Sequence, residues 1–370
     1  MAFQPRNVFI TGGAGFIGAN FVHHWLANSR EGRVVVYDAL TYAGNIDNLA
    51  GLEADPRYVF AQGDICDEAA VSALFEQHHI DTVVHFAAES HVDRSILGPD
   101  DFIRTNVVGT HTLLKVAKAA WIDRKAAAAH RFHHVSTDEV YGSLRPNDPP
   151  FQESTPYAPN SPYSASKAGS DHLVRAYHET YGLSTTVTNC SNNYGPYQFP
   201  EKLIPLTLVN ILLGKPLPVY GDGLQVRDWL HVEDHCMAIA KALTHGQAGE
   251  VYNIGGNSET TNIEIVRTLC ALVDACLAER PDLKGAFPAS PAASGGRAVE
   301  LIAHVRDRPG HDRRYAINYA KAAAELAYAP ARNLTQGLGA TLEWYIEHTD
   351  WWRALMGRDY NAWVRKNYQR

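Results

Sequence analysis

Several classes of protein are excluded by what this 370-residue sequence lacks. Its five cysteines form no CxxC pair and are odd in number, which argues against a disulfide framework or a structural metal and for reduced thiols. A formal net charge of −7 provides no basic surplus for nucleic acid. No run approaches the roughly 18 apolar residues of a membrane helix, and the first apolar segment leaves no room for a signal peptide. We therefore expect a cytoplasmic protein that binds no nucleic acid, membrane or metal.

The N-terminal half alternates between strand-like apolar runs and amphipathic helical segments. Strands are predicted at 7–11, 33–38, 58–61, 82–87 and 132–136, and helices at 16–28, 69–79 and 106–120. Such alternation is typical of a parallel sheet with helices on both faces. The sequence therefore predicts an α/β fold: a doubly wound, Rossmann-like parallel sheet with a smaller C-terminal substrate-binding lobe.

A glycine-rich turn follows the first predicted strand and contains Gly12, Gly13, Gly15 and Gly18. Glycines at these spacings permit a tight turn and let a pyrophosphate approach the backbone at the start of a helix. Asp38 ends the next strand, twenty residues after Gly18. An acidic residue there binds the 2′-hydroxyl of an adenosine ribose and disfavours a 2′-phosphate. The combination predicts bound NAD rather than NADP.

The predicted domains follow from this motif. Residues 1–195 are expected to form the NAD-binding Rossmann domain, and 196–370 mainly the nucleotide-sugar-binding lobe, because proline and glycine become more frequent beyond about 195. Segments near 225–255 are candidates to return to the first domain, since 251–255 has the pattern of a short strand that ends in a glycine turn. The segment 280–297 is rich in Pro, Ala, Ser and Gly and is expected to be an exposed loop.

Two further strings, at 136–142 and 163–167, indicate an acid/base centre. Tyr163 and Lys167 share one face of a helix, where the ammonium and the positive end of a nicotinamide would both favour the phenolate and lower the pKa of the tyrosine. Thr137 would hydrogen-bond the same substrate oxygen as Tyr163. Asp138 and Glu139 are adjacent, so repulsion and burial would keep one of them protonated as an acid beside a base. Two alternatives stay open. Tyr163 and Lys167 could form an exposed i, i+4 pair on a helix, and Asp138 and Glu139 could be an acidic pair at a helix start that the helix dipole favours.

With these motifs the chain resembles the extended short-chain dehydrogenase/reductase superfamily and, within it, the family of dTDP-glucose 4,6-dehydratases. The resemblance runs from Val8 to about Tyr345 and is most specific at 86–95, 136–142, 163–167, 191–202, 227–230 and 307–314. It implies an NAD-dependent loss of water from dTDP-glucose that yields the 4-keto-6-deoxy sugar, a precursor of rhamnose and other deoxysugars. It also implies a tightly held, recycled NAD and a homodimer.

The resemblance gives each residue of the centre a distinct role. Tyr163 takes the proton of the C4 hydroxyl, Glu139 is the base at C5, and Asp138 is the acid that protonates the leaving C6 hydroxyl. The predicted catalytic residues are Thr137, Asp138, Glu139, Tyr163 and Lys167. The predicted NAD contacts are Gly12, Gly15, Phe16, Ile17, Gly18, Asp38, Thr41, Asp64, Ile65, Ala87, Ala88, Ser90, Thr105, Tyr163 and Lys167. The predicted substrate contacts are Ser90, Thr137, Asn192, Lys202, Leu203, Pro218, Tyr220, Arg227, Asn262, Asp307 and His311.

Several alternatives stay open. Asp64, expected near the adenine, could instead cap a helix. Arg227 could form a local ion pair with Asp228, and the arginine among 306–314 that contacts a phosphate is not assigned. A dehydratase that uses UDP-glucose is an alternative function. A C4 epimerase would need neither carboxylate, and a non-catalytic NAD-binding regulator would need no acid/base centre.

Overall fold

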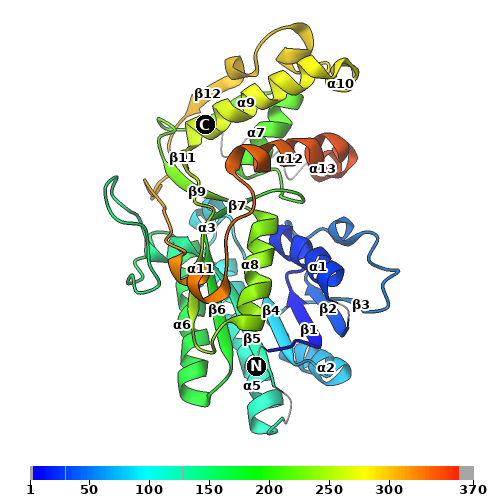
Figure 1. The fold of residues 1–370 in the computed structure, drawn as a ribbon, viewed down its shortest axis with the longest axis vertical. Coiled ribbons are helices and arrows are strands. Elements are labelled where there is room, and N and C mark those ends of the chain that lie inside the picture. The colour runs from blue at the N-terminus through cyan, green and yellow to red at the C-terminus, as the bar shows by residue number, and fades with distance from the viewer. Residues whose placement is uncertain (1–2, 30, 127–128, 358–370) are drawn as a thin grey trace.

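A computed structural model describes residues 3–29, 31–126 and 129–357, so 358–370 of the predicted second lobe lie outside the described residues. Seven parallel strands form the central sheet in the spatial order β10-β6-β5-β4-β1-β2-β3 (Figure 1). The strands are β1 (Asn7–Thr11), β2 (Arg33–Asp38), β3 (Tyr58–Gln62), β4 (Thr82–His85), β5 (Arg131–Thr137), β6 (Thr185–Cys190) and β10 (Val251–Ile254). This arrangement confirms the predicted doubly wound α/β fold.

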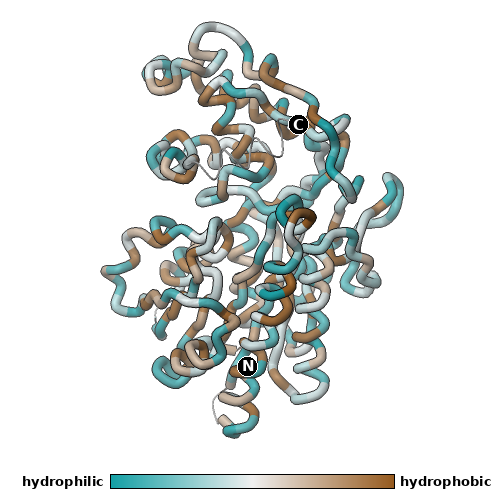
Figure 2. The backbone as a smooth tube through the Cα atoms, turned by 180° about the vertical axis from the view of Figure 1, so that it is seen from behind, coloured by the Kyte–Doolittle hydropathy of each residue, from teal (hydrophilic) through white to brown (hydrophobic). Residues whose placement is uncertain are grey.

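Both faces of the sheet are covered because side chains alternate along each strand. In β1, Val8 and Ile10 pack on one face against helices α1 (Phe16–Asn28) and α8 (Val232–His245), whereas Phe9 packs on the other. That second face is covered by helices α2 (Glu68–His78), α5 (Thr110–Lys118) and α6 (Pro162–Tyr181). Figure 2 shows hydrophobic stretches inside the molecule and hydrophilic residues along the outer loops.

Short helices and turns connect these elements at the edge of the sheet where the strands end. They are η1 (Ile46–Leu49), α3 (Val92–Leu97), α4 (Asp100–Phe102), η2 (Ile103–Gly109) and η4 (Asp138–Tyr141). The turn η3 (Ala119–Asp123) lies at the opposite edge, where Trp121 donates a hydrogen bond to the carbonyl oxygen of Ile80 just before β4. The predicted helix at 106–120 is therefore divided, with π-helical turns at both ends of α5. The predicted strand at 82–87 ends at His85, because residues 86–88 leave the sheet and pass over Gly12.

The second lobe packs its own hydrophobic core above the sheet (Figure 1). Its helices are α7 (Leu203–Leu212), α9 (Asn262–Glu279), α10 (Pro281–Ala286), α12 (Leu334–Glu347) and α13 (Thr349–Leu355). Helix α11 (Ala320–Leu326) instead packs against α8 and β10, beside the central sheet. A three-stranded sheet joins β7 (Asn192–Tyr194), β9 (Val226–His231) and β11 (Glu259–Thr261), and β8 (Leu217–Tyr220) pairs with β12 (Ile302–Val305). Short 3-10 helices η5 (Pro291–Ser294) and η6 (Ala298–Leu301) precede β12. In the described ranges no helix is long and apolar enough to cross a bilayer.

One expectation about this lobe was wrong. The segment 280–297 is not simply an exposed loop, because it contains α10 and η5. Leu283 and Phe287 are buried against the core of the lobe, beside α9. The residues around Leu283 and Phe287 are mostly small or polar, so the sequence pattern did not predict that these two side chains are buried.

Candidate active site

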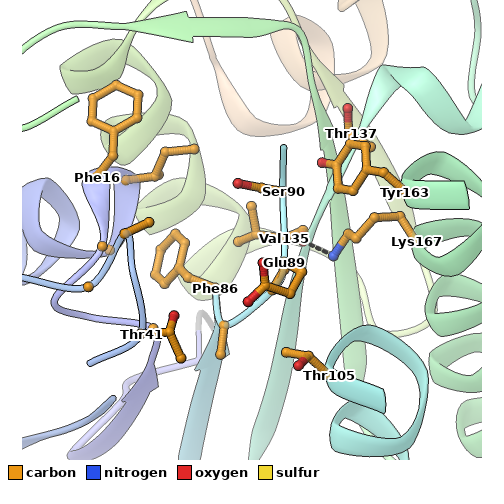
Figure 3. Close-up of a pocket in the computed structure, with 18 of the residues that line it drawn as sticks. Phe16, Thr41, Phe86, Glu89, Ser90, Thr105, Val135, Thr137, Tyr163 and Lys167 are labelled. Atoms are coloured by element: carbon orange, nitrogen blue, oxygen red, sulfur yellow. Dashed lines mark hydrogen bonds between the residues drawn. The ribbon is translucent and has the colours of Figure 1, made fainter. Parts of the chain in front are cut away.

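A cleft with a volume of about 610 Å³ lies where the strands of the central sheet end. Its walls come from the loops after β1 to β4, from the ends of β5 and β6, from α6, and from residues 198–202. Figure 3 shows Phe16 and Thr41 on one side of the cleft and Tyr163 and Thr137 on the other. Ligands of doubly wound sheets bind at this edge. Every predicted NAD contact and all five predicted catalytic residues line this cleft.

The glycine-rich turn allows close approach of backbone segments. Gly12 has φ +68°, and a Cβ atom there would stand 2.5 Å from the backbone nitrogen of Ala87. A Cβ atom on Gly18 would clash with the carbonyl oxygen of Gly12. Only glycine fits these two positions, and the N-terminus of α1 is left open toward the cleft.

Asp38 is held in a defined orientation beside this turn. Its Oδ2 accepts a hydrogen bond from Ala14 N (2.9 Å) and its Oδ1 accepts one from Leu40 N (2.8 Å). Burial raises the pKa of Asp38, while the two N–H donors oppose that rise. Each oxygen keeps a second lone pair, so the carboxylate can still accept hydrogen bonds from a ribose in the cleft.

Asp64 does not cap a helix, since Asp67 caps α2 by accepting hydrogen bonds from Ala69 N and Ala70 N. The carboxylate of Asp64 instead accepts from Cys66 N (2.8 Å) and from Arg104 (2.7 Å). Asp64 lines the cleft. The capping alternative is therefore wrong, and the adenine contact stays a prediction.

Tyr163 and Lys167 lie on the inner face of α6, which starts with a capping box between Ser161 and Ser164. Both are buried, so the alternative of an exposed pair is wrong. The ammonium of Lys167 donates to the carbonyl oxygen of Val135 (2.8 Å), as the dashed line in Figure 3 shows. Burial, and then the charge of Glu139, raise the pKa of Tyr163 well above its usual range. The expected lowering of this pKa is therefore not produced by the protein's own charges.

Asp138 and Glu139 open the 3-10 helix η4, with Thr137 as its N-cap. They do stand at a helix start, but η4 has four residues and a correspondingly small dipole. Asp138 is 1% exposed, and burial followed by the charge of Glu139 raises its pKa well above the usual range. Glu139 is half-buried; burial also raises its pKa, but nearby cations oppose the rise, namely Arg308, Lys202 and Arg227. Burial thus raises the pKa of both neighbours, and the cations oppose the rise at Glu139, while the division of the pair into acid and base stays a prediction.

The predicted substrate contacts divide into two groups. Ser90, Thr137, Asn192 and Lys202 line the cleft, whereas Leu203, Pro218, Tyr220, Arg227, Asn262, Asp307 and His311 do not. Within the second group, the Tyr220 ring lies 5.9 Å from the His311 ring, and Asp307 pairs with His311 at 2.6 Å. Leu203 begins α7 and packs against the core of the lobe, and Pro218 lies in β8 opposite Ala303.

The arginines in this region have different partners. Arg308 contacts Asp93 (2.9 Å), which also accepts from the Tyr220 hydroxyl (3.1 Å). Arg313 and Arg314 instead pair with Asp222 and Glu259. Of these three arginines, Arg308 is the one whose charge acts on Glu139. Among these three arginines, Arg308 is therefore the candidate for a phosphate contact near Glu139.

Arg227 is buried in β9 and donates to the carbonyl oxygens of Val226 (2.7 Å) and Asp312 (3.0 Å). Asp228 accepts from the backbone nitrogens of Gly256 (3.0 Å) and Ser258 (2.6 Å). The local Arg227–Asp228 ion pair that the sequence left open is absent among the described residues.

Sequence reasoning missed two polar groups of the site. Asp171 lies one further helical turn beyond Lys167 and accepts hydrogen bonds from Ser136 (2.8 Å) and Tyr157 (3.0 Å). The four-residue spacing 163, 167, 171 was the available signal. Glu201 is buried, pairs with Arg94 at 3.2 Å and, unlike Asp171, lines the cleft itself. No periodicity marks Glu201, because its partner is 107 residues away.

Comparisons with known proteins agree with this geometry. The family model described as GDP-mannose 4,6 dehydratase matches residues 9–341. A dTDP-glucose 4,6-dehydratase of Neisseria meningitidis is 52% identical, covering 96% of this chain and 97% of the relative. One from Xanthomonas campestris is 54% identical, covering 95% and 96%.

Solved structures extend the comparison. The dTDP-glucose 4,6-dehydratase of Bacillus anthracis, solved in complex with NAD, has a TM-score of 0.82 and 44% identity, covering 95% of this chain and 99% of that one. The Streptomyces venezuelae enzyme, also solved with NAD, has a TM-score of 0.82 and 47% identity, covering 94% and 99%. A UDP-glucose 4-epimerase of Thermotoga maritima is 26% identical, with a TM-score of 0.78 and coverages of 93% and 99%. The chain therefore belongs to the family of dTDP-glucose 4,6-dehydratases, within the extended short-chain dehydrogenase/reductase superfamily.

Proposed function

We propose that this protein converts dTDP-glucose to dTDP-4-keto-6-deoxyglucose by removing one molecule of water. The observation that carries the proposal is the unequal pair Asp138 and Glu139 in one cleft with Tyr163. An epimerase, which only oxidises and reduces C4, has no use for an acid and a base beside the tyrosine. A non-catalytic NAD-binding protein has no use for any of the three.

The residues of the cleft fit NAD. Gly12 and Gly18 let the backbone close into a tight turn that a Cβ atom at either position would block, which leaves the N-terminus of α1 facing the cleft for a pyrophosphate. Asp38 offers a carboxylate where a 2′-phosphate would be repelled. When bound, NAD supplies a hydride acceptor for C4 of the sugar and later a hydride donor for C6. We assign the ribose nearest adenine to Asp38 and the nicotinamide end to the region of Tyr163 and Lys167.

In the proposed reaction Tyr163 accepts the proton of the C4 hydroxyl, and Thr137 hydrogen-bonds the same oxygen. Oxidation at C4 makes the C5 hydrogen acidic. Glu139 then removes that hydrogen, because the surrounding cations favour its charged form. Asp138 is held neutral by burial and protonates the leaving C6 hydroxyl. Finally, Glu139 delivers a proton to C5, after the proton that it carries has exchanged with solvent.

The cations near Glu139 also suit the nucleotide diphosphate. Lys202 lines the cleft, and Arg308 and Arg227 lie close enough for their charges to act on Glu139. In a protein with a net charge of −7, such a local cluster offers charge-assisted hydrogen bonds to phosphate oxygens. We assign Tyr220, Asn262, Asp307 and His311 to the nucleoside, as the resemblance to the family implies. The Oδ1 atom of Asn262 is buried with no protein hydrogen-bond partner among the described residues, which supports that assignment.

The organisation into two domains is part of the proposal. We divide the protein into an NAD-binding domain, residues 1–195, and a lobe that binds the nucleotide sugar, with β10 and the preceding α8 returning to the first domain. Pairing of β10 with β6 and packing of α8 beside α1 support this division. We also propose a homodimer through the helices near 106–120 and 162–181, where Val108 is 48% and Tyr181 44% exposed. Cytoplasmic location stays a prediction.

Incubation of the purified protein with dTDP-glucose, without added reductant, tests the proposal. In D2O, mass spectrometry should find loss of one water and one deuterium at C5. An unchanged mass with a new C4 epimer would overturn it in favour of the epimerase. Faster turnover of UDP-glucose would overturn the choice of nucleotide. Tyr163→Phe is the matched inactive control, because it removes only the proton acceptor.

A further inference from the structure

The proposed reaction leaves protons in the wrong place at the end of each turnover. Tyr163 has gained the proton of the C4 hydroxyl, whereas Asp138 has lost the proton that departs with the C6 oxygen as water. Glu139 is balanced, because it gives C5 one proton in place of the one that it removed. A second turnover therefore requires one proton to move from the phenol to the carboxylate.

One hydroxyl group contacts both residues. Thr137 Oγ1 donates to Asp138 Oδ1 at 3.5 Å, and the same hydroxyl lies close enough to the side chain of Tyr163 to act on its pKa. Figure 3 shows the side chains of Thr137 and Tyr163 next to one another. The backbone nitrogen of Glu139 donates to the same Oγ1 at 3.3 Å, which fixes the position of the hydroxyl. A hydroxyl both donates and accepts, so it can pass a proton between two oxygens.

Other routes for this proton are poorly placed. Tyr163, Thr137 and Asp138 are 9%, 8% and 1% exposed, so bulk water has little access to them while a sugar nucleotide fills the cleft that they line. The ammonium of Lys167 has no acceptor capacity and is engaged by the carbonyl oxygen of Val135. Oδ2 of Asp138 has no hydrogen-bond partner in the described part of the chain, so Oδ1 is its link to neighbouring side chains.

We propose that Thr137 returns the proton from Tyr163 to Asp138 and thereby resets the active site between turnovers. The phenolic proton passes to Thr137 Oγ1 while the threonine's own proton passes to Asp138 Oδ1. Only O–H bonds break and form, and each electron pair stays on its oxygen. Rotation about the Cβ–Cγ bond of Asp138, a broad two-fold torsion, can then present the proton to the substrate. The inference rests on the proposed function and adds a role for Thr137 beyond binding the sugar oxygen.

Rapid mixing of enzyme with saturating dTDP-glucose tests the relay by separating the first turnover from later ones. Thr137→Val keeps the shape of threonine but removes the hydroxyl, and Thr137→Ser keeps the hydroxyl. In Thr137→Val we expect the first turnover to slow by less than about tenfold, the loss of one hydrogen bond to substrate. Later turnovers should slow by about 100-fold, the lower range for positioned proton transfer. Thr137→Ser should show no such difference between phases.

A small proton carrier provides a second measurement. Imidazole should speed the later turnovers of Thr137→Val in proportion to its concentration and leave those of the unaltered enzyme unchanged. Equal slowing of the first and later turnovers, or no response to imidazole, would overturn the relay. Equal slowing is also the result expected if valine merely displaces Asp138 and Glu139. Absence of product from the unaltered enzyme would overturn the proposed function itself, and the relay with it.

Discussion

Asp171 is a buried carboxylate whose ionisation should reduce the stability of the folded protein. Burial is the largest cause that raises its pKa, from 3.8 to about 6, while Lys167 and hydrogen bonds from Ser136 and Tyr157 oppose the rise. Because the folded-state pKa lies above the unfolded value, the folded protein holds this proton more tightly. The resulting stabilisation is complete below pH 3.8 and is lost as the pH rises through about 6.

The magnitude follows from the two pKa values. A tenfold change in an ionisation constant corresponds to about 1.4 kcal/mol, so the full loss is about 3 kcal/mol. About 1.3 kcal/mol of it falls between pH 5 and pH 7 by the same linkage relation. Asp171→Asn removes the titration but keeps an oxygen that accepts the hydrogen bonds of Ser136 and Tyr157. The variant should therefore gain about 1.3 kcal/mol relative to the unaltered protein over that range.

Urea unfolding at pH 5 and pH 7, followed by tryptophan fluorescence, measures this difference. Asp123→Asn is the control, because its carboxylate pairs with Lys118 at the surface and its removal should change stability little. A difference between Asp171→Asn and the unaltered protein that is the same at both pH values would refute the reasoning. So would a relative gain in stability of the variant toward low pH.

Three further substitutions have definite expected outcomes. Gly12→Ala should lose the NAD that copurifies with the protein and should melt at lower temperature than Gly51→Ala. Both have positive φ, but only Gly12 would also clash with Ala87, so equal melting temperatures would contradict the close approach. Glu139→Gln should retain C4 oxidation, seen as reduced-nicotinamide absorbance, and lose exchange of the C5 hydrogen with D2O; undiminished exchange would remove Glu139 as the base. Asp138→Asn should slow elimination by about 100-fold or more, and oxidation far less, in rapid-quench measurements; equal slowing of both steps would exclude a dedicated acid.

Much of the fold was determined by local sequence. The bounds predicted for β1 (Asn7–Thr11), β2 (Arg33–Asp38) and α1 (Phe16–Asn28) are those of the structure. Hydrophobic periodicity and a glycine turn act over a few residues, so one segment contains all the information. The prediction failed at 280–297, because the burial of Leu283 and Phe287 depends on contacts with other elements of the lobe.

The candidate site shows the same division. The sequence by itself determined that the proposed acid/base residues stand in two short strings, since the spacing of Tyr163 and Lys167 and the adjacency of Asp138 and Glu139 are local. Only the tertiary structure decided how these groups differ. Burial raises the pKa of both Asp138 and Glu139. At Glu139 this rise is opposed by the charge of Arg308, which is more than 150 positions further along the chain. Electrostatic and solvation energies depend on distance in space, which the order of residues does not specify.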